Sequence, residues 1–364
     1  MPVKIWSGLT HGMGVGGWLT NYKRFHVLPT EQRLCLTTGD WEHFRSFITE
    51  RDVAYIASLG MDHIRLGFDQ LVVEEAEGCL REEIMCLIDA FITWCERCHL
   101  RVVLNMHKAL GNYCDIQETK ALLDDETLQN RFIAVWQCFE KRYASKPDVV
   151  FEILNEIRDV PPERWNALAQ RTVRAIRALN PTRKIIVGST RWNAPDALET
   201  LRVFDDENVG YTFHCYAPFE FTHQRGVLQT PCCFYNRDMP YPGEIERYRD
   251  YKRTVEQNGH AYDAYERMDR RYLADVLAPA FAFAQKHPDA MLWCGEFGTI
   301  RHAKMAWREN WMRDMITLLQ EHGVPYCAWN YLSTPNDGNR FSLVDDDSRQ
   351  ILSQSMARIL RGEV

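Results

Sequence analysis

Eight short apolar runs recur along the chain and alternate with longer segments whose apolar residues follow a helical period. Runs such as VVLNMH and KIIVGS are apolar without alternation, which is typical of parallel strands covered on both faces. The eight runs are residues 14–19, 63–68, 102–107, 149–155, 184–188, 210–216, 291–297 and 325–329.

The segments between the runs carry helix signals. Thr49, with Asp52 three positions later, predicts a capped helix start, and Val53 and Ile56 follow at helical spacing before Gly60 ends the segment. Eight strands that alternate with helices predict an α/β fold, a (β/α)₈ TIM barrel that forms one catalytic domain over 1–364. A doubly wound open sheet is the competing topology.

One interval is too long for a single helix. Tyr216 and Glu296 are 80 positions apart, so we predict a helical subdomain inserted after strand six, over residues 219–287. This insertion follows the carboxyl end of a strand, the face where barrels carry their active sites. A solvated decoration and a substrate-facing lid are both compatible with its Tyr-rich, mixed-charge composition.

Composition narrows the partners and the location. With 43 Lys and Arg against 50 Asp and Glu, the net charge of -7 has the wrong sign for nucleic acid or an anionic membrane. No apolar stretch reaches the roughly 18 residues of a membrane span, and the first 19 residues lack the apolar core of a signal peptide. Together with 12 scattered Cys, this favours the cytoplasm, with secretion as the alternative if a leader has been removed. The oligomeric state stays open.

Two cofactor motifs match only in letters. Cys95, Cys98 and His99 fit the haem pattern C-x-x-C-H, but both thiols continue the apolar face of a predicted helix, and no second C-x-x-C completes a zinc site. Residues 12–17 fit G-x-G-x-x-G, but no helical period follows, so we interpret them as tight-turn glycines of the first barrel strand. We therefore predict neither cofactor nor metal.

Polar residues stand at the carboxyl ends of the predicted strands, which converge on one cleft in a barrel. Glu156 and Glu296 matter most, because one carboxyl can stay protonated while the other is ionised, which separates a proton donor from a nucleophile. The full set is Arg65, Asn105, His107, Asn155, Glu156, His214, Tyr216, Glu296 and Trp329.

In this order and on these strands, the polar residues resemble the signature of glycoside hydrolase family 5, a cellulase family of retaining barrel glycosidases. The strongest pieces are LNE at 154–156, HCY at 214–216 and GEFG at 295–298, and the resemblance runs from GVGGWL at 14–19 to WNY at 329–331. The chain looks most like bacterial endoglucanases that act on cellulose and mixed-linkage β-glucan and carry a subdomain after strand six.

The resemblance implies a role for each residue. Glu156 would be the general acid/base and Glu296 the nucleophile, with carboxyl groups about 5 Å apart as in a retaining pair. The remaining roles are supportive: Arg65 and Tyr216 hold Glu296 ionised and aimed, His214 lies beside Glu156, Asn155 bonds the sugar 2-hydroxyl, His107 contacts the sugar and Trp329 forms its floor.

Some positions depart from the family pattern. Asn105 and Lys108 stand where relatives often have Asp and a second His, and Ile157 replaces a common Pro, so the preferred polysaccharide is open. Three further aromatics are candidates for the stacking surface, with an ordinary rim or core position as the alternative for each. They are Trp18, Trp192 and Phe219.

The predicted function is therefore a retaining endo-β-1,4-glucanase that acts on a β-glucan polysaccharide or oligosaccharide without a cofactor. Rivals with the same mechanism are a mannanase or xyloglucanase, an oligosaccharide-active exo-β-glucosidase and a transglycosylase. A non-catalytic glycan-binding barrel is a distant alternative, because binding alone gives no reason for two carboxylates and an Arg that serves one of them.

Overall fold

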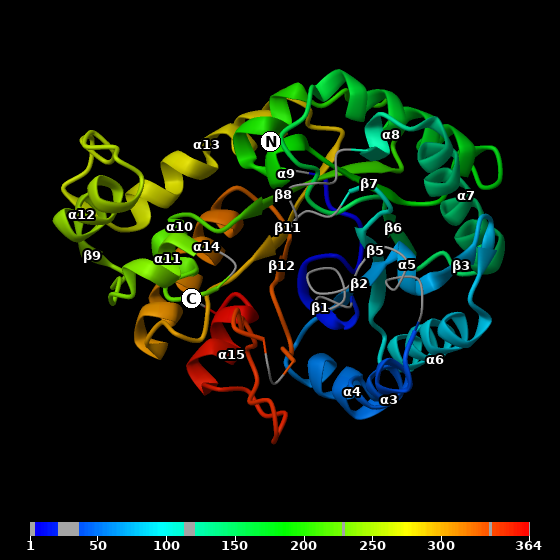
Figure 1. Cartoon of the computed structure of the whole chain (residues 1–364), viewed down its shortest axis with the longest axis horizontal. Helices are drawn as coiled ribbons and strands as arrows, with labels where there is room; N and C mark the ends of the chain where they lie inside the picture. Colours follow the sequence, from blue (N-terminus) through cyan, green and yellow to red (C-terminus); the bar gives the residue numbers. More distant parts are fainter. Residues whose placement is uncertain (1–3, 21–35, 113–120, 228–229, 335–336, 364) are drawn as a thin grey trace.

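Eight parallel strands close into a barrel in the order β1-β12-β11-β8-β7-β6-β5-β2, which confirms the predicted barrel (Figure 1). The computed structural model describes residues 4–20, 36–112, 121–227, 230–334 and 337–363. Closure of the sheet excludes the open doubly wound alternative. The barrel strands are β1 His11–Leu19, β2 His63–Asp69, β5 Arg101–Lys108, β6 Val149–Glu152, β7 Ile185–Gly188, β8 Val209–Cys215, β11 Met291–Phe297 and β12 Tyr326–Ala328.

Helices surround the barrel, and their apolar faces pack onto the outside of the strands. The α-helices are α3 Thr38–Ser46, α4 Glu50–Ser58, α5 Gln70–Val73, α6 Glu82–Arg97, α7 Glu126–Tyr143, α8 Pro162–Arg177, α9 Thr190–Asn193, α10 Phe219–Thr222, α11 Thr230–Tyr235, α12 Ile245–Val255, α13 Arg270–Lys286, α14 Met305–Glu321 and α15 Gln354–Leu360. Shorter elements are the 3₁₀ helices η1 Ala121–Leu123 and η2 Pro195–Thr200, and the strands β3 Glu74–Ala76, β4 Cys79–Leu80, β9 Gly243–Glu244 and β10 Arg267–Met268.

The predicted helix after Thr49 is α4. Asp52 Oδ2 accepts a hydrogen bond from the Thr49 backbone N–H at 2.8 Å, which satisfies a donor that the first turn leaves unpaired. Val53 and Ile56 are fully buried on the inner face. In α6, Cys95 is buried as predicted, which explains half of the C-x-x-C-H motif as core packing.

The glycine motif at residues 12–17 lies inside strand β1, so the tight-turn interpretation was wrong. A Cβ atom on Gly14 or Gly16 would come within 2.7 or 2.3 Å of the Trp329 ring. These glycines therefore allow a close approach between β1 and an indole, a common reason for Gly within a strand.

Between β8 and β11 the chain forms α10, α11, β9, α12, β10 and α13. Helix α13 packs against η2 and α14, so it belongs to the outer helical layer of the barrel rather than to an insertion. The extra elements thus precede α13, and in Figure 1 α12 and β9 project beyond the ring of helices. Residues 228–229 of the predicted insertion lie outside the described residues. That these elements form a subdomain stays a prediction.

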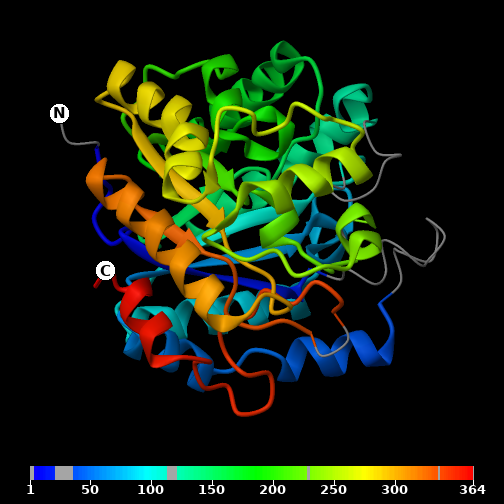
Figure 2. The ribbon, with the colours of Figure 1, turned by 90° about the vertical axis from the view of Figure 1, so that its left-hand side faces the viewer.

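The start of β1 and helix α15 lie on one side of the molecule, on the left of Figure 2, and the elements before α13 extend toward the opposite side. Of the helices within the described ranges, none is long and apolar enough to cross a membrane. The cysteines that the structure describes are all free thiols.

Candidate active site

A cleft of about 1340 Å³ opens at the carboxyl ends of the barrel strands. Glu156, His214 and Glu296 lie on its surface, together with His107 and Trp329. The convergence predicted from the strand ends is thus observed for these residues, and the volume of the cleft is large enough to hold several sugar units.

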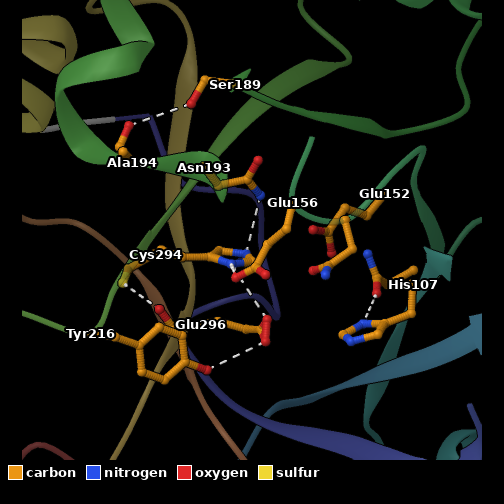
Figure 3. A network of polar contacts seen from close by, with 12 residues as sticks. His107, Glu152, Glu156, Ser189, Asn193, Ala194, Tyr216, Cys294 and Glu296 are labelled. Carbon is orange, nitrogen blue, oxygen red and sulfur yellow. Dashed lines mark hydrogen bonds and ion pairs between the residues drawn. The ribbon is translucent and has the colours of Figure 1, made fainter. Parts of the chain in front are cut away.

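Glu156 and Glu296 point toward one another across the cleft (Figure 3). Glu296 lies within β11, in register with His214 on β8, whereas Glu156 follows β6 in a loop with a φ of 40°. His214 Nδ1 lies 2.9 Å from Glu156 Oε1 and 3.4 Å from Glu296 Oε2. One carboxylate oxygen from each Glu and one His214 nitrogen all lie within 4.8 Å of one another. This spacing fits the short separation of a retaining pair rather than the roughly 6.5–9.5 Å of an inverting pair.

Arg65 contacts both the buried Glu152 inside the barrel and the residues at the floor of the cleft. Its Nε and Nη2 donate to Glu152 at 2.6 and 2.9 Å, and Nη2 also donates to Asn155 Oδ1 at 2.7 Å. The remaining nitrogen, Nη1, lies 3.2 Å from Glu296 Oε2. Arg65 therefore orients Asn155 and contacts Glu296, but most of its hydrogen bonds go to Glu152.

Glu152 was missing from the residues predicted for the site. It is completely buried in β6 and accepts hydrogen bonds from Arg65 on β2, with β5 between the two strands. A carboxylate within the apolar run FEIL was a usable signal, because a charged residue is almost never fully buried unless it is paired.

Burial raises the pKa of Glu296 to about 7, although His214 and Arg65 act in the opposite direction. Glu156 and Glu152 add to the rise, because a like charge nearby disfavours ionisation. The expectation that Arg65 holds Glu296 firmly ionised therefore needs correction: the guanidinium charge is shared with Glu152, which takes the shorter contacts.

His214 is buried, and burial lowers its pKa to about 4, so the imidazole is neutral at pH 7. While Nδ1 faces the two carboxylates, Nε2 lies 3.2 Å from Asn193 Nδ2. Asn193 was missing from the predicted site, because its turn follows strand β7 without a recognisable pattern.

Tyr216 approaches Glu296 from the other side, with its hydroxyl 3.4 Å from Oε1. Burial raises the pKa of Tyr216 well above its usual value, so the hydroxyl keeps its proton and can only donate to the carboxylate. The predicted contact between these two residues is present.

His107 and Trp329 form a flat surface in the cleft. Their rings stack with centroids 5.4 Å apart and an interplanar angle of 4°, and His107 Nδ1 lies 3.0 Å from Asn105 Oδ1. Gly14 and Gly16 leave space behind the indole. An indole face of this kind suits the apolar C–H face of a pyranose.

The three additional aromatics separate into two kinds. Trp192 and Phe219 line the cleft, with 41% and 50% of their surface exposed. Trp18 is only 1% exposed, and its indole N–H donates to the Phe44 carbonyl at 2.7 Å. Trp18 is therefore a core residue, and its candidacy as a stacking surface was wrong.

Glu156, His214 and Glu296 are also the one group of His, Cys, Asp and Glu side chains, within the described part of the chain, that converges closely enough to hold a metal ion. An imidazole N–H placed between two carboxylates accounts for this convergence without an ion. The predicted absence of a metal stays a prediction.

The family described as Cellulase (glycosyl hydrolase family 5) matches this chain over residues 28–334. The chain belongs to glycoside hydrolase family 5. Endoglucanase C of Acetivibrio thermocellus is 33% identical to this family 5 glycoside hydrolase over 96% of the chain and 97% of the relative. Cellodextrinase A of Ruminococcus flavefaciens is 28% identical over 87% of the chain and 84% of the relative.

Solved structures share the fold of this family 5 glycoside hydrolase. A hyperthermophilic endo-beta-1,4-glucanase in complex with substrate superposes with a TM-score of 0.73 at 19% identity, covering 98% of this chain and 97% of that one. Thermotoga maritima Cel5A in complex with mannotriose superposes with a TM-score of 0.73 at 22% identity, covering 97% of both chains. From the family match and the 33% identity to an endoglucanase, the protein is an endoglucanase-like glycoside hydrolase.

Proposed function

We propose that this protein is a retaining endo-β-1,4-glucanase that cleaves β-glucan by double displacement. The observation that carries the proposal is the approach of two carboxylates, Glu156 and Glu296, to within 4.8 Å at the floor of an open cleft. This spacing leaves no room for a water molecule between Glu296 and an anomeric carbon, so Glu296 itself is the nucleophile.

The surroundings of the two carboxyl groups assign their roles. Glu296 faces three donors, Arg65 Nη1, the Tyr216 hydroxyl and His214 Nδ1, all of which favour its ionised form. Glu156 is the more exposed of the two, with a fifth of its side chain open to the cleft. Glu156 is therefore placed to deliver a proton to substrate.

In the first step Glu156 protonates the glycosidic oxygen while Glu296 attacks the anomeric carbon, and the carbon–oxygen bond to the leaving sugar breaks. The product is a glycosyl ester on Glu296 and an ionised Glu156. Glu156 then takes a proton from water, the water oxygen attacks the anomeric carbon, and the ester bond breaks to restore ionised Glu296 and protonated Glu156.

A β-glucan substrate is supported by the two curated relatives named above, an endoglucanase and a cellodextrinase. The stacked surface of Trp329 and the exposed ring of Trp192 suit sugars with flat apolar faces. The elements before α13 act as an inserted subdomain that extends the wall of the cleft, because Pro231 and Lys252 line the same cavity as Glu156. This favours a substrate-facing role for the segment.

The direct test is hydrolysis of cellohexaose followed by ¹H NMR and by chromatography of the products. We expect the β-anomer to form first and a mixture of short cello-oligosaccharides to accumulate. Initial release of the α-anomer would contradict the retaining mechanism, and strict release of one sugar from an end would contradict endo action. Oligosaccharides longer than the starting material would indicate transglycosylation.

A mannan substrate is the second candidate, because one structural neighbour was solved in complex with mannotriose. Parallel rates on barley β-glucan, carboxymethyl-cellulose, glucomannan and xyloglucan separate the candidates. We expect the mixed-linkage glucan to give the highest kcat/KM.

A further inference from the structure

The two ring nitrogens of His214 lie in different surroundings, and only one of them carries a proton. Its imidazole is neutral and therefore carries a single N–H, on either Nδ1 or Nε2. Nδ1 lies 2.9 and 3.4 Å from oxygens of Glu156 and Glu296, and an ionised oxygen, which Glu296 carries at rest and Glu156 carries after the first step, requires a donor. The proton therefore belongs on Nδ1, which leaves Nε2 as an acceptor.

The partner of Nε2 is the side-chain amide of Asn193, whose Nδ2 lies 3.2 Å away. Asn193 is completely buried, so water does not compete for this contact. An amide N–H can donate a hydrogen bond to an unprotonated ring nitrogen, but it cannot donate to a protonated ring nitrogen, which is itself a donor. The geometry of the Asn193 amide thus selects one tautomer of His214.

The backbone around Asn193 is shaped for this contact. Arg191, Trp192 and Asn193 have φ angles of 55°, 57° and 57°, a left-handed conformation that is unfavourable for Arg and Trp and that Asn adopts more readily than most residues. Gly188 provides the space, because a Cβ there would lie 2.4 Å from Asn193 Oδ1. The left-handed backbone at residues 191–193 and the absence of a side chain at Gly188 together place the Asn193 amide against His214 Nε2.

We propose that Asn193 is a positioning residue that holds His214 as the Nδ1–H tautomer, so that its single N–H is directed at the Glu156–Glu296 pair. Asn193 acts only through His214. The charged and titratable groups that face His214 are Glu156 from the loop after β6, Glu296 on β11, Arg65 on β2 and Glu152 on β6, and Tyr216 follows directly after the strand that carries His214.

The consequence is a fixed hydrogen-bond donor that both carboxylates share during turnover. When Glu296 is ionised the N–H supports its charge, and when Glu296 is esterified the same N–H supports the ionised Glu156. A ring that exchanged tautomers would present a lone pair to a carboxylate for part of the time, which repels the charged form. This inference deepens the proposed function and rests on it for its kinetic part.

The first test is ¹⁵N NMR of the histidine side chains at pH 7, which needs no activity. In the wild type we expect His214 Nδ1 to have the protonated and Nε2 the unprotonated chemical shift. In Asn193→Asp, which nearly preserves volume, a carboxylate faces Nε2, so Nε2 becomes protonated. His63 at the far end of the barrel serves as an internal reference that does not change. A protonated Nε2 in the wild type would overturn the proposal.

The second test is the pH profile of kcat/KM. In Asn193→Ala the N–H is shared between the two nitrogens, so Glu296 loses part of its donor and its pKa rises. We expect kcat to fall about tenfold, KM to change less than twofold, and the acidic limb to move to higher pH. Asn166→Ala, which removes a hydrogen-bonded amide on the outer helix α8, is the matched control and leaves the profile unchanged. A variant that loses only thermal stability would contradict the proposal.

Gly188→Ala is expected to break the contact between Asn193 and His214 without changing either of these two residues. Its methyl group displaces the Asn193 amide, so the kinetic and NMR effects of Asn193→Ala are expected to recur. In the Asn193→Ala background the space is available, and Gly188→Ala then adds little. Additive effects would show that Gly188 acts by another route and would contradict the proposed contact. If the NMR shifts behave as expected but no glycan is hydrolysed, the proposed function fails and the tautomer assignment stands.

Discussion

The barrel contains a histidine–carboxylate pair at each of its two ends, and the two pairs behave in opposite ways. At the closed end, Asp62 accepts hydrogen bonds from the backbone N–H groups of Thr10 and His11 and from His63 Nδ1, at 2.7–3.1 Å. Burial alone would raise the pKa of Asp62, but these bonds outweigh it and lower the pKa. The carboxylate is therefore ionised at neutral pH and joins β1 to β2.

At the cleft end, the contacts to Glu296 come from side chains at 3.2–3.4 Å, and burial prevails to raise its pKa. Fixed backbone donors at short distance keep a carboxylate in one state. Side-chain donors at longer distance leave the carboxylate able to change its protonation state and to form a bond to a sugar carbon. The same residue types thus serve structure at one end and chemistry at the other, and substitutions at the two ends should separate these roles.

The largest expected effect is the loss of hydrolysis in Glu296→Gln. Removing the nucleophile eliminates the covalent step, so kcat/KM on barley β-glucan should fall on the order of 10⁴-fold or more. Glu156→Gln should lose a similar factor with natural substrates, which need a protonated leaving group. Wild-type rates in either variant would remove the basis of the proposed function.

The same Glu296→Gln variant is expected to be more stable than the wild type at pH 8. A carboxyl whose folded pKa is raised from 4.5 to about 7 stabilises the fold below pH 4.5, and this contribution is lost as the pH rises through 7. The difference of about 2.5 units corresponds to at most about 3 kcal/mol. Thermal unfolding should show a gain of a few degrees at pH 8 that disappears at pH 4.

Glu140→Gln is the matched control for this stability experiment. Glu140 is buried like Glu296, but it forms a bidentate ion pair with Arg183 at 2.6 and 3.1 Å. Its replacement leaves a buried guanidinium without its counter-charge, so the variant should be destabilised. A stabilised Glu140→Gln variant would show that the gain at Glu296 has another cause.

The raised pKa of Glu296 also predicts the pH dependence of the wild type. The nucleophile must be ionised, so kcat/KM should fall below about pH 7, tenfold for each further unit, and reach about 100-fold at pH 5. A profile that stays flat down to pH 5 would mean that the donors around Glu296 outweigh its burial, as they do at Asp62.

Asp62→Asn tests the closed end of the barrel. The amide has only one acceptor oxygen for the three donors that now converge on the carboxylate, so unfolding should require about 2 kcal/mol less. Denaturant unfolding measures this loss, and kcat/KM below the unfolding temperature should stay within about twofold of the wild type. A large kinetic defect would show that the two ends are coupled.

The smallest effects distinguish structure from substrate contact in two tryptophans. Trp192→Phe, on the cleft, should raise KM for cellopentaose about threefold with little change in stability. Trp18→Phe loses the hydrogen bond to the Phe44 carbonyl, so it should lower stability by about 1 kcal/mol and leave KM unchanged. The reverse pattern would mean that exposure does not identify the stacking residue.

Much of the barrel was predictable because its strands are buried on both faces and therefore appear as continuous apolar runs. The fourth run was predicted over 149–155, but β6 ends at Glu152. The next residues leave the strand, and Asn155 bonds to the Met106 backbone carbonyl while Glu156 adopts a positive φ that aims it into the cleft. The pattern of apolar residues in the sequence does not show where a strand ends and such a turn begins.

The site was predictable where a rule connects sequence to position. Polar residues after barrel strands meet at one end, and this placed Glu156, Glu296 and His214 together. Glu152 and Asn193 escaped because their importance lies in what they contact, Arg65 and His214 respectively. Trp18 was misplaced because the direction of a side chain on a barrel strand depends on register, which single-sequence patterns leave undetermined.

The sequence alone determined the order of the strands, the chemical groups at their ends and the family to which the chain belongs, because these follow from residue type and spacing. Only the tertiary structure decided that Arg65 is shared between Glu152 and Glu296 and which nitrogen of His214 faces the cleft. It also decided how far burial raises the pKa of Glu296. These properties depend on distances of a few ångströms between side chains from different strands, and electrostatic and hydrogen-bond energies change steeply over such distances.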